Sequence, residues 1–206
     1  MKQSINTTWL GLLDYAKALA VQQNNVHNIL SGHGKEVIMG LEHPDVITLG
    51  KRGGLVYPQN IPVVHTNRGG LATGHEPGQL VVYPIVHIQK RQLRVREWVS
   101  ILEDTCIEFL QAQGLLPHRG EHSGLWIQQK KIASIGLHIM QGVSMHGISM
   151  NVNNTLSIFS NMEVCGSTNL TLTSLQKEGI QIDTQTAFTQ IADTLITTLH
   201  AREGLL

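Results

Sequence analysis

The sequence lacks an excess of charge of either sign, because 15 Lys and Arg residues balance 15 Asp and Glu residues in a chain of 206. No long-range electrostatic field is therefore available to attract nucleic acid or an anionic membrane. A long hydrophobic run is also missing: the longest, residues 80–86, has seven residues and contains Pro84. A membrane-spanning helix needs about 20 apolar residues. We therefore expect neither a nucleic-acid partner nor a membrane partner.

The sequence also lacks a signal-like segment and a set of disulfide-forming cysteines. Residues 1–8 carry one charge and no apolar core of the kind found in signal peptides, so we expect a cytoplasmic protein. The two cysteines, Cys106 and Cys165, allow at most one disulfide. A chain of this length buries about 70% of its unfolded surface without such a staple, so we expect both thiols to be reduced.

Apolar residues at helical spacing predict three helices. The first is expected over residues 15–30, after Asp14 as a possible N-cap, and the second over residues 95–112. A third apolar stripe runs over residues 187–199 and is closed by Gly204. The remaining apolar segments are shorter and read as strands.

Alternating or short apolar segments predict the strands. They are residues 36–42, 46–49, 62–66, 80–88, 124–128, 131–139 and 145–152. The last three are too close together for helical crossovers, so they predict an antiparallel meander. With no repeat or linker visible, the order of elements predicts the α/β (α+β) class: one domain over residues 1–206 with helices packed on a sheet.

Residues 68–79 form the most unusual local segment, with four glycines in twelve residues. Dense glycine lets the backbone approach a ligand closely and present its amide groups. The segment matches neither of the two common phosphate-binding glycine patterns. From its composition alone it is either a surface turn or a ligand loop, and His75 is either an acid or base or a turn residue.

Histidine is plentiful, with 11 residues, and this raises the question of a metal site. His118 and His122 have the spacing of half a zinc site. The other half is missing from the sequence, and no dense carboxylate cluster lies nearby. We therefore predict no metal and a solvated loop.

Two cysteines and a lysine pair are the candidates for nucleophilic chemistry. Cys106 lies in the apolar stripe of the second helix, where a thiol packs as a small hydrophobe. Cys165 lies in an aperiodic segment before Gly166, so it is either a nucleophile or a structural thiol. Lys130 and Lys131 stand at a probable hairpin, where successive side chains face opposite ways and only an inward lysine is able to assist a thiol.

Five short motifs in order resemble those of one enzyme family. Residues 42–50 resemble E-H-P-x-V-x-T-x-G, residues 68–79 resemble R-G-G-x-x-T-Y-H-G-P-G-Q, and residues 131–136 resemble K-I-A-[AS]-[IL]-G. Residues 146–152 resemble H-G-x-[AS]-x-N-V, and residues 164–166 resemble P-C-G. Over about residues 12–175 the chain thus resembles the lipoyl(octanoyl) transferases, which belong to the superfamily of biotin and lipoate ligase catalytic domains.

This resemblance implies a fold and a reaction. The fold is a mixed β-sheet packed with helices, with a ligase-like core over about residues 30–206. The reaction moves an octanoyl or lipoyl group from acyl carrier protein to a lysine of a lipoyl domain through an acyl-cysteine thioester, without a cofactor. The implied acceptors are the lipoyl domains of 2-oxoacid dehydrogenases and the glycine cleavage H protein. In this mapping Cys165 is the nucleophile and Lys131 its partner, whereas Lys130 has no role.

The resemblance also implies a set of substrate-binding residues, which should line one pocket. They are Arg68, Gly69, Gly70, Leu71, Ala72, Thr73, Gly74, His75, Ser134, Ile135, Gly136, Gly147, Ile148 and Ser149.

The sequence departs from the family motifs at three positions. Gly74 stands where the motif has an aromatic residue, Glu76 where it has glycine, and Val164 where it has proline. We expect the first two, as members of the pocket loop, to change acyl preference or donor docking. Val164 is expected to affect loop rigidity only.

Two other functions fit parts of this pattern. An ATP-dependent lipoate ligase of the same superfamily would carry an R-R-x-[ST]-G-G-G-x-V-x-H-D pattern, which this sequence does not contain. A non-catalytic relative that binds carrier or lipoyl domains would not need both Cys165 and Lys131. Both residues are present, which favours the transferase.

Overall fold

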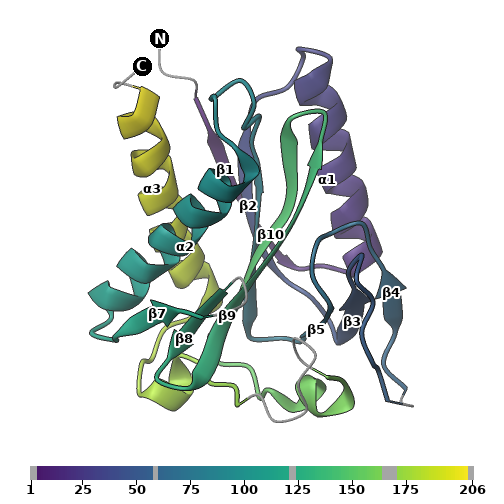
Figure 1. Ribbon diagram of the computed structural model, residues 1–206, viewed down its shortest axis with the longest axis vertical. Helices are drawn as coiled ribbons and strands as arrows, with labels where there is room; N and C mark the ends of the chain where they lie inside the picture. The colour runs from purple at the N-terminus through teal and green to yellow at the C-terminus, as the bar shows by residue number, and fades with distance from the viewer. Residues whose placement is uncertain (1–3, 58–59, 121–123, 164–170, 204–206) are drawn as a thin grey trace.

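The computed structural model describes residues 4–57, 60–120, 124–163 and 171–203. Within them, ten strands form a mixed seven-stranded sheet and a three-stranded sheet, and three α-helices pack on the larger one (Figure 1). The larger sheet has the order β1-β2-β6-β10-β9-β8-β7 and the smaller one β4-β3-β5. The β1–β2 and β3–β4 pairs are parallel and the other strand pairs are antiparallel. This mixed α/β arrangement confirms the predicted fold class.

The first two helices have the predicted bounds. Helix α1 covers Tyr15–Leu30, and the side chain of Asp14 caps it by accepting hydrogen bonds from the backbone N–H groups of its first turn. Helix α2 covers Val95–Ala112 and α3 covers Thr184–Glu203. Gly204, the predicted end of the last helix, lies outside the described residues. In the described part of the chain, no helix is long and apolar enough to cross a membrane.

Strand bounds follow the apolar segments closely. The predicted strands are β2 (Val37–Glu42), β3 (Val46–Leu49), β4 (Val63–His65), β6 (Gln79–Ile85), β8 (Gly124–Ile127), β9 (Lys130–Met140) and β10 (Val143–Asn151). The pairing of β8, β9 and β10 confirms the predicted antiparallel meander.

Three strands lie where no strand was predicted. They are β1 (Asn6–Leu12), β5 (Ala72–His75) and β7 (Pro117–Arg119). All three lie at the edge of a sheet, where a strand pairs with one neighbour only. Their extended conformation therefore depends on that pairing and not on an apolar pattern of their own. Strand β1 pairs with β2 ahead of the ligase-like core expected from residue 30 onward, so the sheet begins well before that point.

Two apolar layers flank the central strands of the large sheet. Helix α1 covers one face, where Val81 and Tyr83 of β6 join Met39 of β2 in a buried cluster. Helices α2 and α3 cover the other face over Leu80 and Val82 (Figure 1). Because β6 is buried on both faces, its sequence is a continuous apolar run instead of an alternating one.

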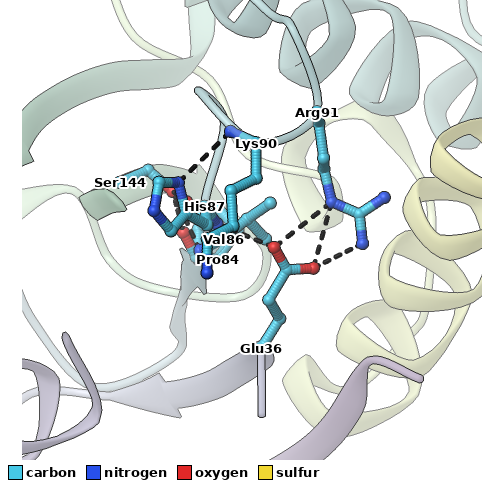
Figure 2. A network of polar contacts seen from close by, with 7 residues as sticks. All are labelled: Glu36, Pro84, Val86, His87, Lys90, Arg91 and Ser144. Carbon is cyan, nitrogen blue, oxygen red and sulfur yellow. Dashed lines mark hydrogen bonds and ion pairs between the residues drawn. The ribbon is translucent and has the colours of Figure 1, made fainter. Parts of the chain in front are cut away.

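A network of buried polar side chains lies at the C-terminal end of β6, around residues 84–87. The buried carboxylate of Glu36 accepts a hydrogen bond from the backbone N–H of His87 at 2.8 Å and forms an ion pair with Arg91 (Figure 2). On the same strand end, the Ser144 hydroxyl donates to the carbonyl of Pro84. A buried charge of this kind is stable only when it is paired and hydrogen-bonded, and both conditions are met here.

Candidate active site

A cavity of about 420 Å³ lies between the glycine-rich segment, the β9–β10 hairpin and the first turns of α1 and α2. Pockets for small ligands usually enclose about 300–1,000 Å³. Strand β5 forms the middle of the glycine-rich segment and pairs with β3, so the small sheet holds this segment against the large one. Figure 1 shows β3 and β5 beside the lower end of the large sheet.

Thirteen of the fourteen residues expected to bind substrate line this cavity. They are Arg68, Gly69, Gly70, Leu71, Ala72, Thr73, His75, Ser134, Ile135, Gly136, Gly147, Ile148 and Ser149. The structure therefore brings together three segments that are far apart in the sequence. Their contact with a substrate stays a prediction.

The fourteenth residue, Gly74, is outside the cavity lining, and so is Glu76. A Cβ atom at position 74 would lie 2.8 Å from Cγ2 of Ile158 and 2.9 Å from Cε of Met162, in a separate apolar cluster. Glu76 is 3% exposed, and its carboxylate accepts hydrogen bonds from residues 154–158. Both positions thus lie beside the cavity, although Ala72, Thr73 and His75 of the same segment line it. Their expected effect on acyl preference or donor docking stays a prediction.

Lys131 points inward and lines the cavity, as one of the two lysines was expected to do. It is 2% exposed, and its Nζ lies 4.9 Å from the ring centroid of Trp126, within the range of a cation–π interaction. Gly124 leaves room for it, since a Cβ there would lie 3.0 Å from Cε of Lys131. Lys130 points the other way and forms an ion pair with Glu178 at 2.6 Å.

Cys165 lies outside the described residues, but the chain on both sides of it is described. The backbone N–H of Glu163 donates to the carbonyl of Leu55 at 3.0 Å. After residue 170 the chain resumes beside Lys131, whose N–H donates to the carbonyl of Thr171 at 2.9 Å. Cys165 is six residues from Thr171, and a chain of that length reaches at most about 20 Å.

Cys106 lies in the core, as expected. It is fully buried on α2, and burial, followed by the charge of Glu103, raises the pKa of its thiol to about 12. A thiol with that pKa is almost entirely protonated at neutral pH, so it is a poor nucleophile.

The candidate zinc half-site falls partly outside the described residues, because His122 is not among them. His118 lies in β7 with its ring nitrogens near the carbonyls of Arg119 and Gln128, at 2.9 and 2.6 Å. Among the residues that the structure describes, no group of three or more His, Cys, Asp or Glu side chains could hold a metal ion.

Arg68 supports one wall of the cavity from a buried position. Its Nη2 donates to the carbonyl of Thr48 at 2.6 Å and to the Thr48 hydroxyl at 2.8 Å, and Nη1 donates to the carbonyl of Gly69 at 3.0 Å. The backbone N–H of Gly69 in turn donates to the carbonyl of Leu137 on β9 at 2.8 Å. These bonds tie the glycine-rich segment to β9 beyond Ser134, where its described pairing with β8 ends.

Four aromatic side chains near Arg68 form a polar wall that the sequence analysis identified only in part. Burial, followed by the charge of His43, lowers the pKa of His75 to about 3, and burial with the charge of Arg68 lowers that of His146 to about 3. Burial raises the pKa of Tyr15 to about 12 and that of Tyr83 well above its usual value. All four side chains are therefore neutral at pH 7 and act through hydrogen bonds.

Three of these residues, Tyr15, Tyr83 and His146, were missed as cavity residues. His146 belongs to the motif of residues 146–152, and that motif was a usable signal. Tyr15 and Tyr83 lie within apolar periodic segments, where nothing local separates a core tyrosine from a cavity tyrosine. The Tyr15 hydroxyl lies 3.5 Å from Nδ1 of His146, which shows that the two meet across the fold.

A chain of side-chain and backbone hydrogen bonds links His75 to Lys131. Nδ1 of His75 lies 2.7 Å from Oε1 of Gln79, whose Nε2 donates to Oδ1 of Asn151 at 3.0 Å. Asn151 donates to the carbonyl of Thr173, and Thr173 N–H donates to the carbonyl of Lys131. Because Gln79 Oε1 can only accept, Nδ1 of His75 carries the proton and Nε2 is the acceptor nitrogen.

The opposite wall of the cavity is apolar. It includes Val95 and Val99 from the first turns of α2, together with Ile135, Leu137 and Ile148 from the hairpin. A site with one apolar wall and one wall of neutral hydrogen-bonding groups suits a ligand with an alkyl chain and an uncharged polar head. The inward lysine adds one group able to carry or accept a proton.

The sequence is similar to a known family over most of its length. Residues 14–196 match the family described as lipoyl protein ligase A/B catalytic domain. An octanoyltransferase of Desulfotalea psychrophila is 41% identical over 182 residues, which cover 82% of each chain. A probable octanoyltransferase of Pyrobaculum arsenaticum is 35% identical over 199 residues, covering 95% of this chain and 92% of the relative.

Solved structures show the same fold at low sequence identity. A bi-partite lipoate protein ligase from Thermoplasma acidophilum superposes with a TM-score of 0.75 at 14% identity, covering 97% of this chain and 85% of the other. The biotin protein ligase of Aquifex aeolicus gives a TM-score of 0.57 at 12% identity, covering 96% and 71%. At these identities the likeness concerns the fold alone.

Proposed function

The chain belongs to the lipoyl protein ligase A/B catalytic domain family, and we propose that it transfers an octanoyl group from acyl carrier protein to a lysine of a lipoyl domain through a thioester at Cys165. The octanoyl group follows from the names of its sequence relatives. The observation that supports the mechanism is the position of Lys131. Its side chain is buried in the cavity wall, and its backbone forms hydrogen bonds with Thr171 and Thr173, which follow Cys165 in the sequence.

Two acyl exchanges make up the proposed reaction. The Cys165 thiol loses its proton, and the thiolate attacks the thioester carbonyl of the donor. A new C–S bond forms, the C–S bond to the carrier breaks, and the carrier thiolate leaves as a thiol by taking up that proton. The neutral amine of the acceptor lysine then attacks the acyl-cysteine, an amide forms, and its proton returns the Cys165 sulfur to the thiol. No external oxidant, reductant or nucleotide is needed for this balance.

Lys131 acts as the proton-transfer partner in this scheme. In its charged form it favours the Cys165 thiolate, and in its neutral form it accepts the proton that the acceptor amine loses. The acceptor nitrogen of His75 offers a neutral hydrogen-bond partner in the same cavity. The apolar wall, with Val99 and Ile148, would cover the alkyl chain, whose burial contributes about 0.8 kcal/mol for each methylene group.

We propose that the fourteen predicted substrate residues divide by position: the thirteen in the cavity lining contact substrate, and Gly74 does not. The whole chain, residues 1–206, is proposed to act as one catalytic domain. Among acceptors, the lipoyl domains of 2-oxoacid dehydrogenases and the H protein remain the expected ones. The cytoplasm remains the expected location.

The proposal is tested by incubating the protein with octanoyl-acyl carrier protein, without ATP, and measuring its intact mass. We expect a mass increase of one octanoyl group for the wild type and for Cys106→Ala, and none for Cys165→Ala. Adding an acceptor lipoyl domain should then discharge the adduct. If Cys165→Ala still formed the adduct, the assigned nucleophile would be wrong, and a strict need for ATP with free octanoate would indicate a ligase instead.

A further inference from the structure

The Glu76 carboxylate forms hydrogen bonds with residues 154–158, a segment that does not line the cavity. Its Oε1 accepts hydrogen bonds from Asn154 Nδ2 and the backbone N–H of Leu156, and its Oε2 accepts from the hydroxyls of Thr155 and Ser157 and the N–H of Ile158. Five donors on one buried carboxylate come from five consecutive residues. The turn that gathers them includes Leu156 at φ 70°, a left-handed conformation that leucine rarely adopts.

Gly74 provides the space in which the same segment packs. The absent side chain at position 74 leaves room for Ile158, which is 1% exposed, and for Met162, which is 4% exposed. A Cβ atom at 2.8–2.9 Å from these two side chains would force them to move. Gly74 and Glu76 therefore contact one segment, residues 154–163, from one side.

Residues 55–57 also hold that segment. The backbone N–H of Tyr57 donates to the carbonyl of Asn161 at 2.9 Å, and the N–H of Glu163 donates to the carbonyl of Leu55 at 3.0 Å. Val56 and Met162 form an antiparallel bridge between the two. The last described residue of this segment, Glu163, is two residues before Cys165 in the sequence.

We infer that Glu76 is a positioning residue for acyl transfer, which it serves by fixing residues 154–163, with Gly74 as the space that this arrangement needs. The inference rests on the proposed function, because the segment matters for catalysis only if Cys165 is the nucleophile. Glu76 and Gly74 are also the two positions at which the glycine-rich segment departs from the motif of residues 68–79. One packing arrangement explains both departures: the missing aromatic makes space for Ile158 and Met162, and the carboxylate caps the turn.

The variant Glu76→Gln tests the inference with little change in shape. Whichever oxygen becomes the NH₂ group, one backbone N–H, of Leu156 or of Ile158, then faces a donor and loses its acceptor. Glu36→Gln is the matched control, because Glu36 is also a buried carboxylate but bonds to His87 and Arg91 beyond the other end of β6 (Figure 2). The measurements are the single-turnover rate of Cys165 acylation, the donor KM and the urea unfolding curve.

We expect Glu76→Gln to lower the acylation rate of the folded protein by about tenfold or more with a donor KM changed by less than about twofold, since small displacements of reacting groups cost much rate. Glu36→Gln should lower stability but keep the acylation rate within about twofold of wild type. Ser157→Ala, which removes one exposed donor, gives a milder variant that should fold and show a smaller loss in the same direction.

The rate of iodoacetamide labelling adds a measurement that a change in stability alone would not alter. Cys106 is buried, so the labelling rate in the native protein reports Cys165. That rate should change in Glu76→Gln and stay unchanged in Glu36→Gln. If Glu76→Gln kept both the acylation rate and the labelling rate of wild type, the positioning role would be overturned while the nucleophile assignment stood. If instead Cys165→Ala retained the acyl adduct, the proposed function itself would fail.

Discussion

At the scale of single residues, two adjacent lysines meet different surroundings. Lys131 is 2% exposed in the cavity wall, whereas Lys130 reaches Glu178 at a partly exposed site. Alternation along β9 separates them, since the two side chains leave opposite faces of the strand. The pair is therefore a built-in comparison between a proposed catalytic lysine and a surface lysine of identical chemistry.

We predict that Lys131→Met lowers acyl transfer by roughly a hundredfold or more, the usual loss for a positioned acid or base, while Lys130→Met has little effect. Without the Lys131 charge, the thiolate fraction of Cys165 should fall, so alkylation at a given pH should slow. Turnover and alkylation rate measured against pH check both statements. A larger defect in Lys130→Met, or wild-type behaviour of Lys131→Met, would contradict the pairing of Lys131 with Cys165.

At the scale of elements, the start of α3 is tied to the glycine-rich segment through one carboxylate. Glu42, at the end of β2, accepts hydrogen bonds from the Thr184 hydroxyl and from the backbone N–H of Gly78, the latter at 2.6 Å. Helix α3 also packs directly on β2, where Gly40 faces Phe188. The helix therefore helps to hold both the sheet and the loop that borders the cavity.

We predict that Gly40→Ala destabilises the protein by about 1–3 kcal/mol or more, because the added Cβ would lie 2.3 Å from the Phe188 ring and overpack the interface. In the double variant Gly40→Ala/Phe188→Leu, the smaller side chain should relieve part of that cost. Urea unfolding of the two single variants and the double variant measures the coupling. Strictly additive losses would show that α3 does not touch β2 through this pair.

At the scale of the whole molecule, two buried neutral histidines of the cavity make the free energy of unfolding depend on pH. His75 and His146 have pKa values lowered to about 3 in the folded protein, chiefly by burial, whereas an unfolded chain has a histidine pKa of about 6.5. As the pH falls below about 6.5, the unfolded state binds protons that the folded state does not. Stability from these residues is present above that pH and is lost as the pH falls toward 3.

We predict that His146→Gln reduces the loss of stability between about pH 6.5 and pH 3, because each such histidine contributes up to about 1.4 kcal/mol per pH unit in that range. The exposed His33 provides the control variant His33→Gln, which should keep the wild-type slope. The free energy of unfolding in urea, measured at several pH values, gives the slopes. Equal slopes in wild type and His146→Gln would mean that His146 is not held neutral by the fold.

Local patterns in the sequence were sufficient for several features of this protein. Helices α1 and α2 and the meander of β8, β9 and β10 follow from apolar periodicity, because a buried helix face or strand needs a regular set of apolar residues. The inward direction of one lysine at positions 130 and 131 follows from strand alternation. The core position of Cys106 follows from its place in a helical stripe, and the motifs identified the family and most of the cavity lining.

Other features depend on which segments meet in space, and only the tertiary structure decided them. Strands β1, β5 and β7 have no strong pattern of their own, because a partner strand supplies their hydrogen bonds. Gly74 and Glu76 lie next to His75 in the sequence, yet they face residues 154–163 instead of the cavity. Tyr15 and His146 meet across 131 positions of chain. The sequence by itself determined most of the elements and the family. Contacts between distant segments decided which side chains share the cavity, because a local sequence pattern does not indicate which distant segment will pack against it.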